Sequence, residues 1–299
     1  MLNSFIMQFR TLDDVIKFFD ERVEVESQQG DTVYDGLLHC ASIAGVSRGK
    51  RLTDDSDKER LVRHLIKQGH YSVFEFSRIN NRVNARHFVE FYVRQGFDAD
   101  DILNIAQNEL RDKSVDAYYP AVSVKAPSAI ITHFLRHRSF AFLSVSFRYV
   151  KDSDLFEDGL RYLEGFGIDT AGLKMILSYK RDLDNRKIPA EFTRLLLPFA
   201  TFYWVFFTPT TNNPVFSFAN FFALRANTKA QFETALVAYV IYRKLTERFN
   251  PLVKMIEAEI KTNKVLSPYL SNSIFGLGEQ EFLSKLQKKF EKRLIRRER

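Results

Sequence analysis

The sequence holds very little cysteine and glycine, and each shortage excludes a class of protein. Its 299 residues include one cysteine, Cys40, so disulfide scaffolds and cysteine metal sites are excluded and a reducing compartment is expected. Cys40 stands in an apolar run, where a buried, inert thiol is expected. There are 12 glycines, fewer than the average of about 7% would give. This favours a dense, helix-rich body.

Several sequence signals of function are also missing. No uncharged run reaches the roughly eighteen residues that span a membrane, and the N-terminus does not read as a signal peptide, so we expect a cytoplasmic protein. Glycine-rich phosphate loops, an HExxH pair and a serine hydrolase elbow do not occur. His133 and His137 are four residues apart but have no third ligand at hand, so no metal site is expected.

Positive charge is in excess. Lysine and arginine number 44 against 37 acidic residues, which gives a net charge of +7 and a pI near 9.3. With 45% hydrophobic and 27% charged residues, the composition is that of a folded protein. The charge suits an anionic partner, but it does not separate a nucleotide from a nucleic acid or a membrane surface.

The apolar pattern predicts short strands and long helices without regular alternation, which indicates an α+β fold with a mixed sheet in a single domain, 1–299. Residues 79–120 read as a separate helical excursion, with its best-capped helix at 98–110. Helices are predicted at 11–28, 56–68, 216–249 and 279–298, the last one basic and amphipathic, and a further helix is predicted to start at Pro127. Ser56 or Asp57 is expected to cap the helix at 56–68, and Gly69 to end it. Strands are predicted at 71–79 and 121–127, and residues 152–172 are predicted to form a loop or lid.

One stretch concentrates cations among apolar residues. Residues 134–151, FLRHRSFAFLSVSFRYVK, carry Arg136, His137, Arg138, Arg148 and Lys151. Buried cations without partners are costly, so this cluster needs either solvent or a bound anion. Arginine forks suit phosphates and pyrimidine carbonyls. Two further arginines, Arg194 and Arg225, also stand in apolar settings. The alternative for each is a partly buried structural arginine paired with a carboxylate.

The spacing Arg136-His137-Arg138, seven residues, Ser146, then Arg148-Tyr149 resembles the signature of the flavin-dependent thymidylate synthases, the ThyX family. Four more stretches follow the family's order: RHLIKQGHYSVFEF, VKAPSAIITHFLRHR, AEFTRLLLPF and NFFALRANTKAQFE. The resemblance covers a core of 36–250, interrupted by apparent insertions at 79–120 and about 207–214 and followed by a basic helical extension, 265–299.

The resemblance implies an enzyme that methylates dUMP to dTMP, with FAD as cofactor and with NADPH and methylenetetrahydrofolate as co-substrates. It also implies a homotetramer whose flavin sites are shared between subunits. We expect the tetramer as well because the apolar segments around 202–222 exceed what a monomer would cover. Carried over by position, the flavin contacts are Ser72, Arg136, His137, Arg138 and Asn220. The nucleotide contacts are His133, Ser144, Ser146, Arg148, Arg194 and Arg225, of which Arg136 and Arg225 are the catalytic candidates, with Arg225 facing the pyrimidine.

Two departures from the family pattern keep other functions open. Leu143-Ser144 stands where Asn-Glu is usual, which removes a carboxylate, and His133 replaces a usual glutamine. The alternatives are a pyrimidine-nucleotide hydroxymethylase or a non-catalytic protein that binds a nucleotide or nucleic acid. The basic tail permits a nucleic-acid arm, but a helix packed on the body or on another subunit is the expected interpretation.

Overall fold

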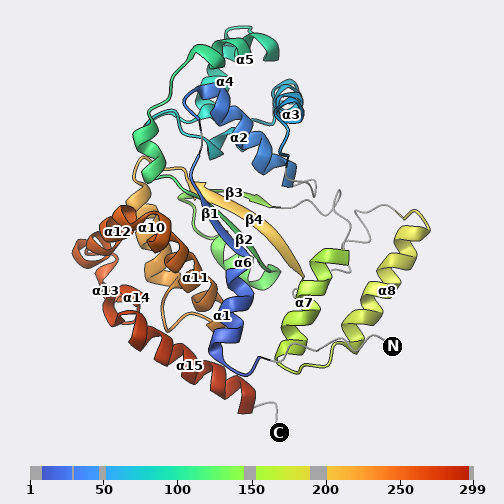
Figure 1. Cartoon of the computed structure of the whole chain (residues 1–299), viewed down its shortest axis with the longest axis vertical. Coiled ribbons are helices and arrows are strands. Elements are labelled where there is room, and N and C mark those ends of the chain that lie inside the picture. Colours follow the sequence, from blue (N-terminus) through green and yellow to red (C-terminus); the bar gives the residue numbers. More distant parts are fainter. Residues whose placement is uncertain (1–8, 29, 47–51, 145–152, 189–200, 296–299) are drawn as a thin grey trace.

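The computed structural model describes residues 9–28, 30–46, 52–144, 153–188 and 201–295, and its centre is an antiparallel sheet (Figure 1). The sheet has the order β1-β2-β4-β3 within this described part. The α+β class is confirmed, whereas the predicted mixed sheet is antiparallel in all its pairings. Its strands are β1 (Val23–Glu26), β2 (Ala121–Pro127), β3 (Phe140–Ser144) and β4 (Phe202–Pro209).

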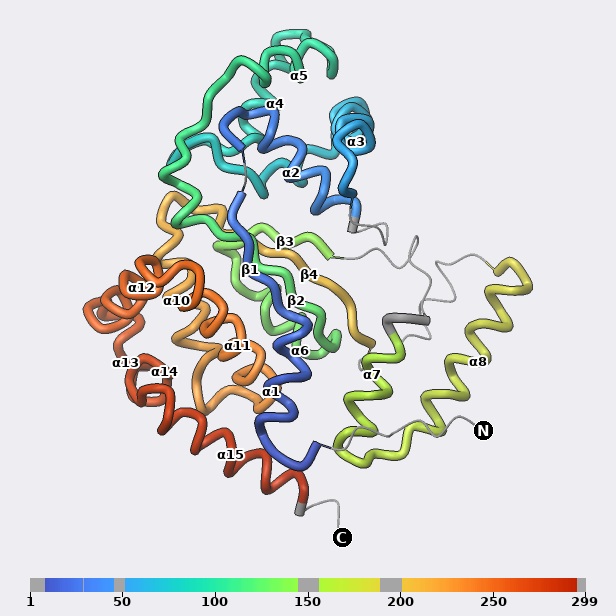
Figure 2. The backbone as a smooth tube through the Cα atoms, viewed as in Figure 1, coloured from blue at the N-terminus to red at the C-terminus, as the bar shows by residue number. Residues whose placement is uncertain are grey.

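One face of the sheet carries the main hydrophobic core. Alternate strand residues such as Val124, Val205 and Phe207 point into it, as the two-residue repeat of a strand requires. Long helices cover this face, and Figure 2 shows the last of them running along the outer side of α11. The helices that contribute are α1 (Leu12–Asp20), α6 (Ser128–Phe134), α10 (Pro214–Arg225), α11 (Phe232–Arg248), α12 (Asn250–Thr262) and α15 (Glu279–Ile295).

The opposite face packs a second, smaller core. Phe206 lies between two residues of the first core and points the other way, together with Ala121 and Ala141. Cys40 is fully buried in this second core, and burial raises the pKa of its thiol, so the expected inert thiol is confirmed. The elements of this layer are α2 (Val33–Val46), α3 (Asp55–Lys67), η1 (Tyr71–Phe76), α4 (Ala85–Arg94) and α5 (Ala99–Asn108).

Four predictions of local structure are wrong. The helix expected over 11–28 ends at Asp20, because Val23 and Val25 alternate with glutamates and join the sheet as β1. The strand expected over 71–79 is a 3₁₀ helix, since the consecutive residues Val73 and Phe74 are both buried in one core, which a strand's alternation does not permit.

The third concerns the predicted loop 152–172. It contains the helix α7 (Ser153–Gly165), and α8 (Ala171–Asn185) begins before its end. Phe156 and Tyr162 on α7 and Phe166 directly after it are buried and follow a helical spacing. Gly165 lets Phe9 approach closely, because an added Cβ there would lie 2.4 Å from the Phe9 ring.

The helix expected over 216–249 is two helices, α10 and α11, separated by a loop at Ala226–Gln231. Asn227 causes the break, because its side-chain amide donates to the Ala223 carbonyl at 2.9 Å and its side-chain oxygen accepts from the Lys229 amide at 2.9 Å. Asparagine competes with helical hydrogen bonds in this way. The break opens the chain at the place where the candidate site lies.

Other predictions are confirmed. The helix α3 ends before Gly69, which has a φ of +70°, although its cap is Asp54 rather than Ser56 or Asp57. Residues 79–120 are helical, and α5 starts with a capping box on Asp98. In α15 the stripe of Phe282, Leu286 and Phe290 is fully buried on the body. The short helices η2 (Lys113–Ala117), α13 (Ser267–Leu270) and α14 (Ile274–Leu277) complete the described elements.

One premise of the tetramer prediction does not hold. The apolar segment around 202–222 is covered within the single chain, since Phe202, Phe207, Phe218 and Phe222 are all fully buried. The segment therefore needs no second copy to cover it. Within the described residues, no helix combines the length and the apolar character that crossing a membrane requires.

Candidate functional site

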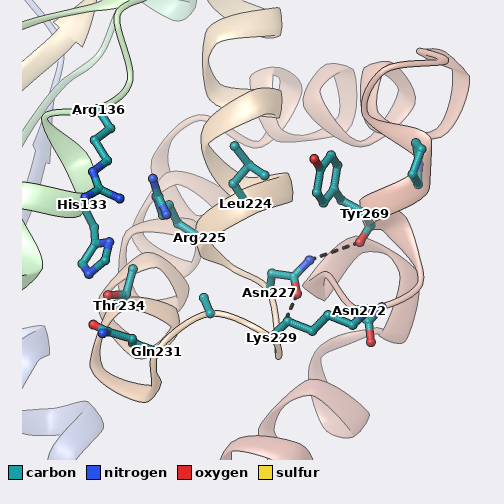
Figure 3. A pocket seen from close by; sticks show the side chains of 12 residues that line it. His133, Arg136, Leu224, Arg225, Asn227, Lys229, Gln231, Thr234, Tyr269 and Asn272 are labelled. Atoms are coloured by element: carbon teal, nitrogen blue, oxygen red, sulfur yellow. Dashed lines mark hydrogen bonds between the residues drawn. The ribbon is translucent and has the colours of Figure 1, made fainter.

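A cavity of about 410 Å³ lies where α6, the α10–α11 loop and the α13 region meet. Its size falls in the range of small-molecule sites. Figure 3 shows Arg136 and His133 on one side, Arg225 and Lys229 across from them, and Tyr269 and Asn272 on the far wall. The remaining lining residues are Leu224, Asn227, Ala230, Gln231, Thr234 and Pro268.

The cavity is positively charged. Arg136, Arg225 and Lys229 line it, whereas aspartate and glutamate are missing from its lining within the described part of the chain. None of these three cations has an ion pair with a described residue. Unpaired cations around one cavity are suited to an anionic ligand. The alternative that Arg225 is a structural arginine paired with a carboxylate therefore does not hold for the described residues.

Arg225 is held in place by a histidine instead of a carboxylate. Its Nε donates to Nε2 of His137 at 2.9 Å, and this is the one side-chain hydrogen bond of Arg225 among the described residues. The two terminal nitrogens of the guanidinium have no partner among the described residues and can face a ligand. The buried His137 ring also packs edge-on against Phe221, with 5.2 Å between centroids.

The site electrostatics follow from this geometry. Burial, and then the charge of Arg225, lower the pKa of His137 to about 4, so at neutral pH its imidazole is uncharged and can accept the hydrogen bond. Burial also lowers the pKa of His133, as do the charges of Arg225 and Arg136, while a hydrogen bond with Gln231 opposes them. Burial and the charge of Arg136 lower the pKa of Arg225. The positive charge at the cavity is therefore carried by Arg136, Arg225 and Lys229 rather than by the histidines.

The structure brings together some of the predicted site residues and not others. His133, Arg136 and Arg225 line one cavity, and His137 lies directly behind Arg225. Arg138 is exposed in the turn after α6 and does not line it. Ser72 on η1 and Asn220 in the middle of α10 also lie outside the lining, so their contacts with a flavin stay predictions. Ser146, Arg148 and Arg194 fall outside the described residues.

The first departure from the family pattern, Leu143-Ser144, lies at the end of β3. Leu143 packs partly buried against the second core, which accounts for an apolar residue there. Ser144 is exposed, pairs with Val205 and does not line the cavity.

Most of the residues that line the cavity were not predicted from the sequence. Lys229, Gln231 and Thr234 lie in or next to the stretch NFFALRANTKAQFE, but no function was expected for them. Tyr269 and Asn272 come from the turn-rich stretch SPYLSNS, where serine, proline and asparagine signal a turn and nothing more. Only the break between α10 and α11 brings these two stretches to one cavity.

One polar side chain in the cavity has no partner of its own in the described part of the chain. Thr234 is 1% exposed and lines the cavity, and its hydroxyl has no hydrogen-bond partner among the described residues. A buried polar group of this kind points to a ligand that supplies the partner. Together with the free arginines, it fits a ligand with phosphates and carbonyl acceptors, as a flavin nucleotide has.

A second cavity, of about 380 Å³, is different. It lies beside α2 and α3, and its lining includes the carboxylates of Glu26, Asp35 and Asp55 with a single cation, Lys58. Carboxylates repel an anionic ligand, so the first cavity is the candidate nucleotide site. In the described part of the chain, no group of three metal-binding side chains lies close enough to hold a metal ion.

Comparisons with known proteins agree with the signature. Residues 117–250 match the family model of the thymidylate synthase complementing proteins. A flavin-dependent thymidylate synthase of Pseudothermotoga lettingae is 23% identical over 210 residues, which cover 66% of this chain and 75% of that protein.

Two crystal structures of a UMP/dUMP methylase from Streptomyces cacaoi, bound with 5-Br UMP and 5-Br dUMP, are similar at 17% and 16% identity. Each comparison covers 79% of this chain and 94% or 95% of that one, with TM-scores of 0.38 and 0.39. The family match, which covers less than half of the chain, and the relative from Pseudothermotoga lettingae agree with the resemblance to the flavin-dependent thymidylate synthases.

Proposed function

We propose that this chain is a flavin-dependent enzyme that methylates the pyrimidine ring of a uridine nucleotide, dUMP to dTMP in the first place. The observation that carries the proposal is the cavity in which Arg136 and Arg225 have no carboxylate partner among the described residues while His137 holds Arg225. The names of the relatives, a flavin-dependent thymidylate synthase and a UMP/dUMP methylase, support it.

In this proposal the arginines bind and polarise the ring. Hydrogen bonds from the free nitrogens of Arg225 to a ring carbonyl draw electron density toward that oxygen and stabilise the charge that develops there. The neutral His137 fixes the orientation of the guanidinium. No nucleophilic cysteine is required of Cys40, which is buried and has a raised pKa.

The flavin, when bound, would supply the redox chemistry of the methyl transfer. Arg136, Arg138, Asn220 and Ser72 are the residues proposed to hold it, with His137 beside them. NADPH and methylenetetrahydrofolate are the proposed co-substrates. We further propose a cytoplasmic homotetramer, in which a second copy would add to the exposed side of the site at Arg136 and Arg138.

The test is to purify the chain and to measure flavin absorbance, dUMP binding by calorimetry, and tritium release from C5-labelled dUMP with FAD, NADPH and methylenetetrahydrofolate present. We expect a yellow protein that binds dUMP and releases tritium together with dTMP. If flavin and dUMP bind but no tritium is released, the chain is a non-catalytic binding protein. If neither ligand binds, the proposal is wrong.

A further inference from the structure

The far wall of the cavity comes from a part of the chain beyond the stretch that matches the family model, which ends at residue 250. This C-terminal segment, residues 266–295, is pinned to the α10–α11 loop. Its first part pairs with the loop in an antiparallel manner around the bridge of Asn227 with Ser273. The bonds are Thr228 N to Asn272 O (2.8 Å), Ile274 N to Ala226 O (3.0 Å) and Asn227 Nδ2 to Tyr269 O (3.3 Å).

The second part, helix α15, holds the other end of the same loop. Lys289 donates to the carbonyl of Ala230 at 2.7 Å. Arg293 donates to both carboxylate oxygens of Glu233, at 2.8 and 2.9 Å, and its guanidinium lies over the Phe232 ring, 4.7 Å from the centroid. The buried stripe of α15 fixes the helix from which these two side chains reach.

The residues that Lys289 and Arg293 contact, Ala230 and Glu233, are next in sequence to residues that line the cavity. Ala230 follows Lys229, and Glu233 precedes Thr234. Burial lowers the pKa of Lys289, as does the charge of Arg293, whereas the charge of Glu233 acts to raise it. The basic character of the tail therefore serves contacts inside the molecule, at the rim of the cavity formed by residues 226–231.

We propose that the C-terminal segment is a specificity element of the nucleotide site, in which Tyr269 forms a wall for a planar ring and Lys289 with Arg293 are positioning residues for the rim. The inference rests on the proposed function for the identity of the ligand. Tyr269 is 42% exposed although it lines a cavity, so its ring is open to a ligand. Aromatic rings at such walls bind planar rings by stacking.

The positioning role is tested by Lys289→Met, with Lys288→Met as the matched control. Lys288 is the preceding residue, exposed and without a side-chain hydrogen bond or ion pair to a described residue, so both variants lose one charge from the same helix. Dissociation constants for dUMP and for FAD are measured separately by calorimetry. We expect Lys289→Met to weaken at least one of them about tenfold, as loss of a charged hydrogen bond does, and to speed amide hydrogen exchange at residues 226–231.

A second test of the positioning role compares two substitutions of Arg293, one that keeps its positive charge and one that removes it. Arg293→Lys keeps a cation for Glu233 and should retain most of the affinity, whereas Arg293→Ala should lose it as Lys289→Met does. Equal affinity in Lys289→Met, Lys288→Met and the native protein would overturn the positioning role.

The wall is tested by Tyr269→Ala and Tyr269→Phe. The phenylalanine retains the ring and should bind like the native protein, while alanine should weaken binding of the ring that stacks there about tenfold. The separate dUMP and FAD titrations decide which ring that is. If Tyr269→Ala binds both ligands as the native chain does while Arg225→Ala does not, the stacking role of Tyr269 is wrong and the proposed function stands. If the native chain binds neither ligand, the proposed function has failed.

Discussion

Two groups of basic side chains in this molecule have opposite surroundings. Arg22 and Lys125 share one buried carboxylate, since each lies 2.6 Å from an oxygen of Asp158. Arg136 and Arg225 share a cavity and have no carboxylate partner among the described residues. The first group has its partner within the chain, because both cations contact Asp158 and Arg22 also lies over the Phe18 ring. The second group needs a partner from outside.

The comparison separates structural from functional charge. A paired buried cation that loses its partner destabilises the fold, because the remaining charge stays without compensation. An unpaired cation at a cavity contributes little to stability and can be removed at the cost of ligand binding. Each of the following variants should move one of these properties and leave the other.

The largest effect is expected for Asp158→Ala. Although burial acts to raise it, the pKa of Asp158 is lowered by hydrogen bonds from Arg22 and Lys125, which shows that the pair holds the carboxylate charged. Its removal leaves the largely buried Lys125 without a carboxylate among the described residues and Arg22 with only the longer contact to Glu21, at 3.6 Å. We expect a loss of about 3–5 kcal/mol in the free energy of unfolding, measured with urea. Asp182→Ala, which breaks the exposed pair with Arg186, is the control and should change little. Equal effects of the two variants would contradict the comparison.

His137 provides a pH-dependent test. Its folded pKa of about 4 lies below the ordinary value of 6.5, so between these values the unfolded chain binds a proton that the folded chain does not. Stability from this group is complete above pH 6.5 and falls as the pH drops toward 4, by about 3 kcal/mol. His137→Gln should flatten the profile of unfolding free energy in this window, whereas His64→Gln, at an exposed position, should not. An unchanged profile in His137→Gln would show that His137 is not buried in its neutral form.

Arg225→Ala should affect binding rather than folding. Loss of its charged hydrogen bonds is expected to weaken dUMP binding by about 1.5–3 kcal/mol, with little change in the urea midpoint. Because the charge of Arg225 helps to lower the pKa of His137, that pKa should rise in the variant, which NMR titration can follow. Arg60→Ala, on an exposed pair, is the control. A folded Arg225→Ala protein with native affinity would mean that Arg225 does not face the ligand.

The sequence predicts the parts of this molecule that depend on local signals. Gly69 marked the end of α3, the cap at Asp98 marked the start of α5, and an apolar stripe indicated α15. Arg136 and Arg225 were singled out because charged residues in an apolar setting are visible in the sequence. The loop at Ala226–Gln231 was not predicted. Asn227 breaks the helix through local bonds to Ala223 and Lys229, but the bond to Tyr269 that also holds its side chain comes from far along the chain.

The dependence on long-range contacts also explains why the cavity residues of the C-terminal segment were not predicted. Nothing in SPYLSNS marks Tyr269 as a site residue, because its position follows from pairing with a loop some forty residues earlier. Likewise, the buried face of α7 could not be read from its polar, glycine-containing sequence until Arg22 and Lys125 supplied partners for Asp158. Long-range pairing decided both, and it has no local sequence signal.

The smallest effect on stability is expected for Ser144→Glu, which restores the carboxylate that is usual in the family pattern after Arg136-His137-Arg138. Ser144 is exposed at the end of β3, so the change should alter the free energy of unfolding by no more than about 0.5 kcal/mol. A new negative charge cannot attract an anionic nucleotide, so dUMP binding should not tighten. If the usual acid positions the ring, however, turnover in the tritium-release assay should rise, since a small misplacement can cost about a hundredfold in rate. Ser144→Gln, with the same length and no charge, separates charge from size. Rapid turnover in the native chain that Ser144→Glu abolishes would show that Ser144 belongs to a site adapted to work without the acid, and that the unpaired arginines need no carboxylate beside them.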